Sequence, residues 1–314
     1  MNGNSQVAAN VSLWRRADIL LMGSISGVYL LLSRFLIGFR PEQVFLVGFV
    51  NLMYFISRGT RKFITGFSIF IIYWIIFDYM KAFPNYKYAT VHIQGLYDLE
   101  KSIFGIHLDG LILTPNEFWH SHGKTILDVL SGCFYLTWIP VPLLFASYLF
   151  YKNRRLFLYF SLTFFLVNLI GFVIYYTYPA APPWYVQQYG FVFHEHTPGN
   201  IAGLGKFDQF FNVEIFKSLY SKSSNTFAAM PSLHSSYPAI VFYYSLRNKM
   251  GYKSIFFGII MVGVWFAAVY TGHHYVLDVL AGIACAATGI ILFNWLVAKN
   301  ILTGFIERLV KLTK

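Results

Sequence analysis

Charged residues are scarce in this chain of 314 residues, where they make up 12% of the sequence against the roughly 25% usual in a soluble globular domain. Lysines and arginines number 24 against 13 acidic residues, and 57% of all residues are hydrophobic. A soluble protein of this length would need far more charge to cover its surface. The composition therefore excludes an ordinary soluble enzyme and indicates that much of the apolar surface faces lipid.

Cysteine is scarce as well. The two cysteines, Cys133 and Cys285, both lie inside apolar runs and form no Cys-x-x-Cys motif. We therefore predict neither a structural disulfide nor a metal centre held by thiolates. The histidines of the His194-Glu195-His196 triplet lie two residues apart without a third ligand, which is a weak metal signal. We predict no bound metal.

The excess of basic residues follows a membrane pattern. Lysines and arginines gather in short clusters between apolar runs, at 58–62, 152–155, 247–253 and 299–314. Such clusters are typical of cytoplasmic loops in multi-pass membrane proteins. The sequence has no basic helix and no basic groove interleaved with aromatic residues, which a nucleic-acid binder would show. We therefore predict contact with membrane, no nucleic acid, and a cytoplasmic position for all four clusters.

Eight apolar segments are long enough, or nearly so, to cross a membrane as helices. We place them at 17–38, 43–56, 63–80, 125–150, 156–178, 231–246, 254–270 and 274–298, the second and sixth being short. The predicted fold class is therefore all-α, a polytopic membrane helical bundle.

With the basic clusters inside, four connections become exoplasmic, at 39–42, 81–124, 179–230 and 271–273. Almost all residues capable of chemistry lie in or beside the last three of these connections. The loop 179–230 is too long for a simple connector, and its aromatic and proline content favours an ordered lid. The sequence therefore places a candidate site on the exoplasmic face of an integral membrane protein.

One histidine motif stands at the start of the sixth segment. Pro231 and Ser232 precede His234 there. Proline suits the first turn of a helix, and the free backbone N–H groups of that turn attract anions.

A second histidine motif stands at the start of the last segment. His274 lies four residues before Asp278, so the two side chains share one helix face, whereas the residue four beyond His273 is a leucine. A carboxylate bonded to one imidazole nitrogen fixes the tautomer and raises the nucleophilicity of the other nitrogen.

Together the two motifs supply the parts of a metal-free phosphoryl transfer, with His274 as nucleophile, Asp278 orienting it, and His234 as acid and base. A lone histidine in a membrane helix more often hydrogen-bonds between helices, but two at helix starts on one face favour catalysis. A transporter with a proton relay is the alternative from another class. Transport sites tend to lie near the bilayer midplane between repeats, and this chain shows no internal repeat.

At these residues the sequence resembles the type 2 phosphatidic acid phosphatase superfamily, and within it the branch of the aureobasidin-resistance protein, the inositol phosphorylceramide synthases. The resemblance rests on Pro-Ser-Leu-His at 231–234, His-His-Tyr-Val-Leu-Asp at 273–278, Ala-Pro-Pro-Trp-Tyr at 181–185 and, more weakly, Tyr-Asp-Leu-Glu-Lys-Ser-Ile-Phe-Gly at 97–105. The matches span about two thirds of the chain.

The resemblance implies a phosphotransferase for lipid substrates. It would move the phospho-headgroup of phosphatidylinositol to the primary hydroxyl of ceramide through a phosphohistidine, giving inositol phosphorylceramide and diacylglycerol. Imidazoles supply both nucleophile and proton transfer, so we predict no cofactor. A lipid phosphate phosphatase that uses water as acceptor is the alternative, because it shares every catalytic residue. The headgroup, the acceptor and the oligomeric state stay open.

Two departures from the superfamily pattern concern the phosphate site. Phosphatases of the superfamily usually carry Ser-Gly-His, but Leu233 replaces the glycine here, as in the synthase branch. They also carry an arginine six residues before the nucleophilic histidine, where this chain has Ala268. The pattern is therefore closer to the synthases than to simple phosphatases.

Other groups must then bind the substrate and stabilise the charge on phosphorus. Our candidates are the backbone N–H groups near Ser232 and the side chain of Lys81, whose alternative role is interfacial snorkelling. Asp78 is a partner for a polyol headgroup or for Lys81. Trp184 and Tyr185 are predicted to border the headgroup, with anchoring at the membrane interface as the alternative.

The resemblance also refines the expected architecture. It implies a six-helix core of the phosphatidic acid phosphatase type plus an N-terminal helix pair, with an interfacial segment and the long loop on the exoplasmic face. We accordingly divide the chain into N-terminal membrane helices (1–62), a catalytic membrane domain (63–298) and a basic cytoplasmic tail (299–314). The tail has apolar residues at helical spacing and is expected either to lie on the inner membrane surface or to fray.

Overall fold

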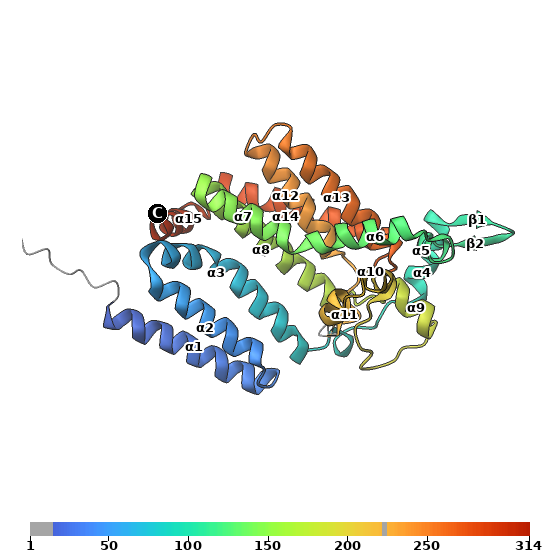
Figure 1. The fold of residues 1–314 in the computed structure, drawn as a ribbon, viewed down its shortest axis with the longest axis horizontal. Coiled ribbons are helices and arrows are strands. Elements are labelled where there is room, and N and C mark those ends of the chain that lie inside the picture. Colours follow the sequence, from blue (N-terminus) through green and yellow to red (C-terminus); the bar gives the residue numbers. More distant parts are fainter. Residues whose placement is uncertain (1–14, 222–224) are drawn as a thin grey trace, which may run out of the picture.

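The computed structural model describes residues 15–221 and 225–314 as a bundle of helices that run along the long axis of the molecule (Figure 1). The helices of the bundle are α1 (Arg16–Leu36), α2 (Pro41–Ile56), α3 (Arg58–Tyr79), α6 (Thr125–Tyr135), α7 (Pro140–Lys152), α8 (Arg154–Thr177), α12 (Leu233–Arg247), α13 (Lys253–Tyr270) and α14 (Val276–Ala298). Five of these helices are long and apolar enough to cross a membrane by themselves, namely α1, α3, α8, α13 and α14. This confirms an all-α, multi-pass membrane protein.

The predicted single helix over 125–150 was wrong. The segment breaks into α6, a 3-10 turn at Leu136–Trp138, and α7, with a bend of 42° between the two helical parts. Pro140 is the first residue of α7 and Pro142 follows it. A proline has no backbone N–H and its ring clashes with the preceding turn, so the helix cannot continue through this point.

The two segments predicted to be short are short. Helix α2 has 16 residues and α12 has 15. Helix α12 is nevertheless buried along most of its length, because α8, α13 and α14 all pack against it. It lies inside the bundle, and only its last two residues, Leu246 and Arg247, are exposed.

Aromatic side chains dominate the largest core, which joins α3, α7, α8, α12 and α14. The fully buried Phe157 ring lies 5.4 Å from the centre of Phe67 and 5.2 Å from that of Phe150. These distances suit offset and edge-on packing of aromatic rings. Gly66 allows the close approach, since a Cβ there would lie 2.9 Å from the Phe150 ring.

The C-terminal tail forms a helix, α15 (Thr303–Thr313), that belongs to the same core. Its residues Ile306 and Val310 are buried, and the helix packs against α3 and α8. The tail is therefore a helix packed on the bundle and not a frayed end, while its position on the inner membrane surface stays a prediction. The division at residues 62 and 298 stays a prediction.

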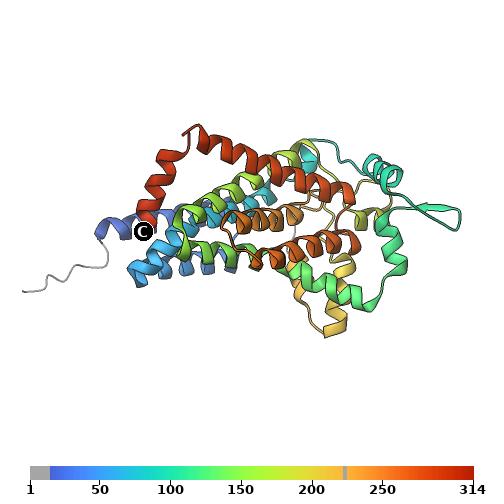
Figure 2. The same cartoon turned by 90° about the horizontal axis from the view of Figure 1, so that it is seen from above.

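All four basic clusters lie at one end of the bundle, which we call the basic end (Figure 2). Arg155 forms an ion pair with Glu307, and Lys62 donates to the backbone carbonyl of Lys314. Arg247 donates to the Asn294 side chain at 2.8 Å, near the end of α14. These contacts bring the α2–α3, α7–α8 and α12–α13 links together with the tail.

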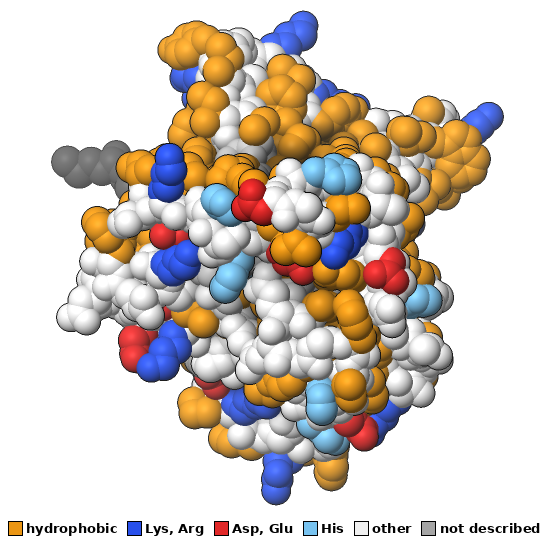
Figure 3. Space-filling view, turned by 90° about the vertical axis from the view of Figure 1, so that its right-hand side faces the viewer, with side chains coloured by type: hydrophobic (Ala, Val, Ile, Leu, Met, Phe, Trp, Pro, Cys, Tyr) orange, Lys and Arg blue, Asp and Glu red, His pale blue; other side chains and the backbone are white. Residues whose placement is uncertain are grey.

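The opposite end carries a layer of short elements, built from residues 81–124 and the described part of 179–230, which we call the cap layer. Its described residues form five short α-helices and one β-hairpin. Figure 3 shows histidine, acidic and basic side chains among apolar ones on its surface. The elements are α4 (Gln94–Phe104), β1 (Ile106–Leu108), β2 (Leu111–Leu113), α5 (Pro115–His122), α9 (Pro183–Tyr189), α10 (Gly205–Phe211) and α11 (Ile215–Tyr220).

Backbone hydrogen bonds join the two halves of the cap layer. Ala180 donates to the carbonyl of Phe227 at 2.9 Å, and the neighbouring Ala181 donates to the carbonyl of His92 at 3.0 Å. The buried amide of Asn85 donates to the carbonyls of both Tyr175 and Phe227, at 2.9 and 2.8 Å. The described part of the long loop is thus fixed to α8 and to the segment before α4.

Helices α12 and α14 cross closely near their starts. A Cβ on Gly282 would lie 2.1 Å from the carbonyl oxygen of Ser232, so only glycine permits this approach. Two hydrogen bonds hold the crossing, from the backbone N–H of Ser232 to the carbonyl of Asp278 at 2.9 Å and from the Ser236 hydroxyl to the carbonyl of Gly282 at 2.7 Å.

We expect Gly282→Ala to separate the two helix starts, because its methyl group would meet a backbone atom that cannot rotate away. The cost of such overpacking is about 1–3 kcal/mol, and it would appear as a lower unfolding temperature of the purified protein in detergent. Gly27→Ala in α1 is the matched control, since its Cβ would meet nothing within 4 Å. Equal unfolding temperatures for the two variants would contradict the close crossing.

Candidate active site

Three side chains predicted to be catalytic lie together where α12 and α14 begin. Nδ1 of His234 is 3.1 Å from Nε2 of His274, and Nδ1 of His274 is 3.6 Å from Oδ2 of Asp278. His234 is in the first turn of α12, and His274 lies in the link between α13 and α14. The order carboxylate, imidazole, imidazole matches a relay in which one imidazole is oriented and the other is free to exchange a proton.

Asp278 is fully buried and has two further contacts. Its Oδ2 accepts a hydrogen bond from the backbone N–H of Tyr275 at 2.8 Å, and its carbonyl accepts from Ser232. Among the described residues, neither Oδ1 of Asp278 nor Nδ1 of His274 has a partner within hydrogen-bond distance. The His274 imidazole and the Asp278 carboxylate therefore face each other, and each keeps one polar atom without a hydrogen bond.

Asn116 fixes the backbone that carries His274. Its buried side-chain amide donates to the carbonyl of His274 at 2.9 Å and to that of Val269 at 2.7 Å. The N–H of His274 also donates to the carbonyl of Ala268 at 3.0 Å. Asn116 of α5 thus holds the end of α13 and His274 together, and the N–H of His274 ties the link back to α13.

Glu100 of α4 caps the start of α14 from the other side. Its two carboxylate oxygens accept from the backbone N–H groups of Val276 and Leu277, at 2.9 and 3.0 Å. Burial raises the pKa of the Glu100 carboxyl to about 7, against the opposing effect of these hydrogen bonds. A carboxylate suits this position because the free N–H groups of a helix start carry partial positive charge.

The surroundings of His234 come from the bent segment. The Tyr135 hydroxyl lies 3.3 Å from Nδ1 of His234, and the Trp138 ring meets the imidazole edge-on at 4.5 Å. Both residues stand just before the break at Pro140, so the bend between α6 and α7 places them against the histidine. They give His234 an aromatic wall and one hydroxyl neighbour.

His273 does not join the relay. Its Nδ1 lies 3.1 Å from the Thr271 hydroxyl, and its ring packs against Tyr220 and Tyr135 at 4.6 and 5.4 Å. Burial lowers the pKa of His273 well below its usual value and that of His274 to about 4. Both imidazoles are therefore neutral near pH 7, which is the form that a nucleophilic His274 requires.

Ser232, predicted to contact phosphate, is buried and supports the start of α12. Its hydroxyl accepts from the N–H and the hydroxyl of Ser235, at 3.3 and 3.0 Å. Its own N–H is bonded to Asp278. Ser232 therefore positions the helix that carries His234, and its N–H is not free for an anion.

The other predicted substrate-binding residues fall into two places. Lys81 and Asp78 form an ion pair of 2.7 Å at the end of α3, with each side chain about one-fifth exposed. Trp184 and Tyr185 are buried within the cap layer. The N–H of Trp184 donates to the carbonyl of Gly272 at 3.0 Å. This bond ties α9 to residues 271–275 between α13 and α14, which we call the histidine link. The Tyr185 hydroxyl donates to the carbonyl of Val192 at 2.8 Å.

Sequence reasoning missed the supporting residues. Glu100 falls in the weakest of the four matched motifs, and nothing near it in the chain indicates that it reaches α14. Asn116 follows Pro115 inside a Thr-x-x-Glu capping box, a signal that predicts α5 but not its amide contacts. Tyr135 and Trp138 looked like ordinary residues of one membrane helix.

Residues 106–292 match the family model of the PAP2 superfamily. The chain is 43% identical to the phosphoinositol dihydroceramide synthase of Bacteroides thetaiotaomicron over 282 residues, 89% of this chain and 92% of that protein. It is 28% identical to the inositol phosphorylceramide synthase catalytic subunit aur1 of Schizosaccharomyces pombe, and 26% identical to that subunit, AUR1, of Saccharomyces cerevisiae.

These fungal matches cover 77% and 73% of this chain but 56% of each fungal protein, so the chain spans little more than half of their length. No solved structure matches the chain. The family model covers more than half of the sequence, and the bacterial relative aligns along nearly all of both chains. The chain therefore belongs to the PAP2 superfamily, and within it to the inositol phosphorylceramide synthase-like phosphotransferases.

Proposed function

We propose that this protein moves a phospho-headgroup, inositol phosphate from phosphatidylinositol, to the primary hydroxyl of a ceramide-type lipid. The observation that carries the proposal is the His234–His274–Asp278 relay, with its 3.1 and 3.6 Å separations at one end of a membrane bundle. The names of the relatives supply the lipid class, since two of them are inositol phosphorylceramide synthases and one is a phosphoinositol dihydroceramide synthase.

In the first step, Nε2 of His274 attacks the phosphorus of the donor lipid. A nitrogen–phosphorus bond forms and the bond from phosphorus to the diacylglycerol oxygen breaks. His234 enters this step as an imidazolium, gives one proton to that oxygen and is left as a neutral imidazole. Asp278 faces the other nitrogen of His274 at 3.6 Å and stabilises the positive charge that develops on the ring. The product of this step is diacylglycerol and a headgroup phosphohistidine.

In the second step, His234 takes the proton of the acceptor hydroxyl. The hydroxyl oxygen bonds to phosphorus and the bond to Nε2 of His274 breaks, which returns both histidines to their starting state. At 3.1 Å the two imidazoles leave no room for a phosphoryl group between them. The two rings must therefore separate when lipid enters, and Tyr135 and Trp138 are the side chains in contact with His234.

The phosphoryl oxygens still need a partner for their charge. Lys81 is the cation that we propose for this role, with Asp78 as its ion-pair partner 2.7 Å away. Trp184 and Tyr185 act on the substrate through the cap layer that they hold over the histidine link. Ser232 acts through α12, whose first turn it caps.

We also propose that the relay faces the exoplasmic side. The basic clusters gather at the end of the bundle opposite to the cap layer (Figure 1), and lysine and arginine mark the cytoplasmic side of multi-pass proteins. The lipids would then meet the histidines from the outer leaflet.

Removing either part of the relay should abolish transfer while leaving the fold intact. We expect His274→Asn and Asp278→Asn to lower the transfer rate by about 10³-fold or more, measured with a fluorescent ceramide and phosphatidylinositol in detergent. His273→Asn is the matched control, because His273 is equally buried but has no carboxylate partner. A His274 variant that transfers as fast as the His273 variant would remove the proposed nucleophile.

The identity of the acceptor, ceramide or water, distinguishes a transferase from a phosphatase. Purified protein given phosphatidylinositol and ceramide should form a ceramide product and diacylglycerol in equal amounts. Without ceramide, a single turnover should leave the radiolabelled phosphoryl group on His274 in an acid-labile form. Release of free phosphate from phosphatidic acid, without any ceramide product, would replace the proposal by the phosphatase alternative.

Sidedness can be measured with single cysteines on a Cys133→Ser background, because Cys133 is exposed and Cys285 is buried. We expect an impermeant thiol reagent to label Glu195→Cys in the cap layer on intact cells. Lys152→Cys at the basic end should be labelled only after permeabilisation. Both positions are exposed, so equal labelling of lysed cells is the control. The reverse pattern would place the relay on the cytoplasmic side.

A further inference from the structure

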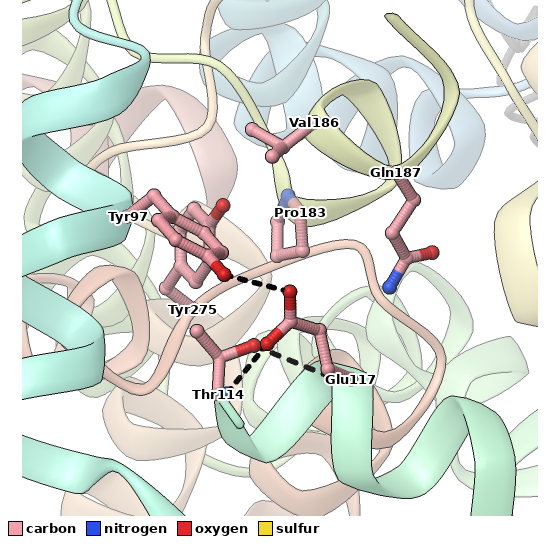
Figure 4. Close-up of a pocket in the computed structure, with 7 residues that line it drawn as sticks. All are labelled: Tyr97, Thr114, Glu117, Pro183, Val186, Gln187 and Tyr275. Atoms are coloured by element: carbon pink, nitrogen blue, oxygen red, sulfur yellow. Dashed lines mark hydrogen bonds between the residues drawn. The ribbon is translucent and has the colours of Figure 1, made fainter. Parts of the chain in front are cut away.

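A small polar pocket lies between the cap layer and the histidine link, beside the relay (Figure 4). It has a volume of about 50 Å³ and is lined by four separate segments: α4, the start of α5, α9 and the residue after His274. The lining residues are Tyr97, Thr114, Glu117, Pro183, Val186, Gln187 and Tyr275. Since a buried water occupies roughly 10–15 Å³ by this kind of measure, the pocket has room for a few hydroxyl-sized groups.

Glu117 is the one charged residue among those that line the pocket, and hydrogen bonds hold its carboxylate in place. One oxygen accepts from the Tyr97 hydroxyl and the other from the backbone N–H of Thr114, both at 2.8 Å (Figure 4). Lys101 donates to the same Tyr97 hydroxyl at 3.1 Å and so brings a positive charge close to Glu117. A carboxylate oxygen accepts two hydrogen bonds, so Glu117 keeps capacity for a ligand.

Tyr275 supplies the second polar group. Its side chain is 1% exposed, and its hydroxyl has no hydrogen-bond partner among the described residues. A buried hydroxyl without a partner is costly. The N–H of the same residue donates to Asp278, so the backbone that carries the Tyr275 ring is fixed to the relay. The hydroxyl is thus an unpaired donor and acceptor on a residue that lines the pocket.

Gln187 supplies the third polar group, from helix α9. It extends toward Glu117 across the pocket in Figure 4. The bond from Trp184 to the carbonyl of Gly272 fixes α9 against the histidine link, and the Gln187 side chain reaches to within about 4 Å of the position of a Cβ on Gly272. The amide offers both a donor and an acceptor.

We propose that this pocket binds hydroxyl groups of an uncharged polyol headgroup on the donor lipid and so selects the donor; the inference rests on the proposed headgroup transfer. Glu117 can only accept, whereas Tyr275 and Gln187 both donate and accept, so a ligand that does both makes use of all three groups. Hydroxyl groups do both. A choline group offers no hydrogen bonds, and an ammonium group offers donors only.

The pocket is too small for a whole headgroup ring. We therefore expect it to bind hydroxyl groups on the side of the headgroup away from the phosphate, while the phosphate stays at His274. A site built to hydrogen-bond substrate hydroxyls discriminates strongly against analogues that lack them. The proposal therefore assigns donor selectivity to Glu117, Tyr275 and Gln187. Of these three, only Tyr275 is close to the relay in the sequence.

Binding without turnover tests the pocket directly. We would measure the unfolding temperature of the purified protein in detergent with dioctanoyl phosphatidylinositol, phosphatidylglycerol or phosphatidylcholine. The wild type should be stabilised most by phosphatidylinositol and least by phosphatidylcholine. Tyr275→Phe and Glu117→Gln should each weaken the affinity for phosphatidylinositol by about tenfold, the effect of one lost hydrogen bond, with little change for phosphatidylcholine.

Tyr88→Phe is the matched control, because Tyr88 lies in the cap layer but is exposed and does not line the pocket. Transfer rates with each donor complete the test. The pocket proposal fails if the variants bind all donor lipids equally more weakly, or if they keep the wild-type preference for phosphatidylinositol. If transfer to ceramide proceeds in either case, the proposed function stands. If the wild type prefers phosphatidylinositol in binding but transfers nothing, the proposed function fails and the pocket stands.

Discussion

The close crossing of α12 and α14 is the constraint on which the site depends. The two histidines belong to different segments, and neither can reach the other unless the two helix starts approach to backbone contact. Gly282 makes that approach possible by presenting no side chain to the carbonyl of Ser232. The bond between Ser232 and Asp278 then fixes the register of the crossing with the same residue that orients His274. Packing and catalytic geometry are therefore set by one contact.

Two carboxylates hold the start of α14. Asp278 accepts from Tyr275 within the first turn, and Glu100 accepts from the next two N–H groups from α4. Asn116 secures the backbone before that turn from α5. Two elements of the cap layer thus support the histidine link. The cap layer is part of the active-site framework as well as a cover over it.

Much of the fold could be predicted from the sequence because apolar runs, basic clusters and the spacing of His274 and Asp278 are local signals. The helices that bear the relay begin within two residues of their predicted starts. The break at Pro140 was missed because hydropathy alone does not register a lost N–H. Glu100, Asn116 and the pocket around Tyr275 depend on contacts between segments far apart in the chain, which no periodicity reveals.

The direct contact between the two imidazoles has a consequence for the resting protein. When Nδ1 of His274 carries the proton toward Asp278, the lone pair on Nε2 points at His234, 3.1 Å away. That electron pair is then engaged in a hydrogen bond before any lipid arrives. In the proposed reaction, a phosphodiester group that enters between the two rings would break this hydrogen bond. The substrate itself would then expose the nitrogen that attacks it.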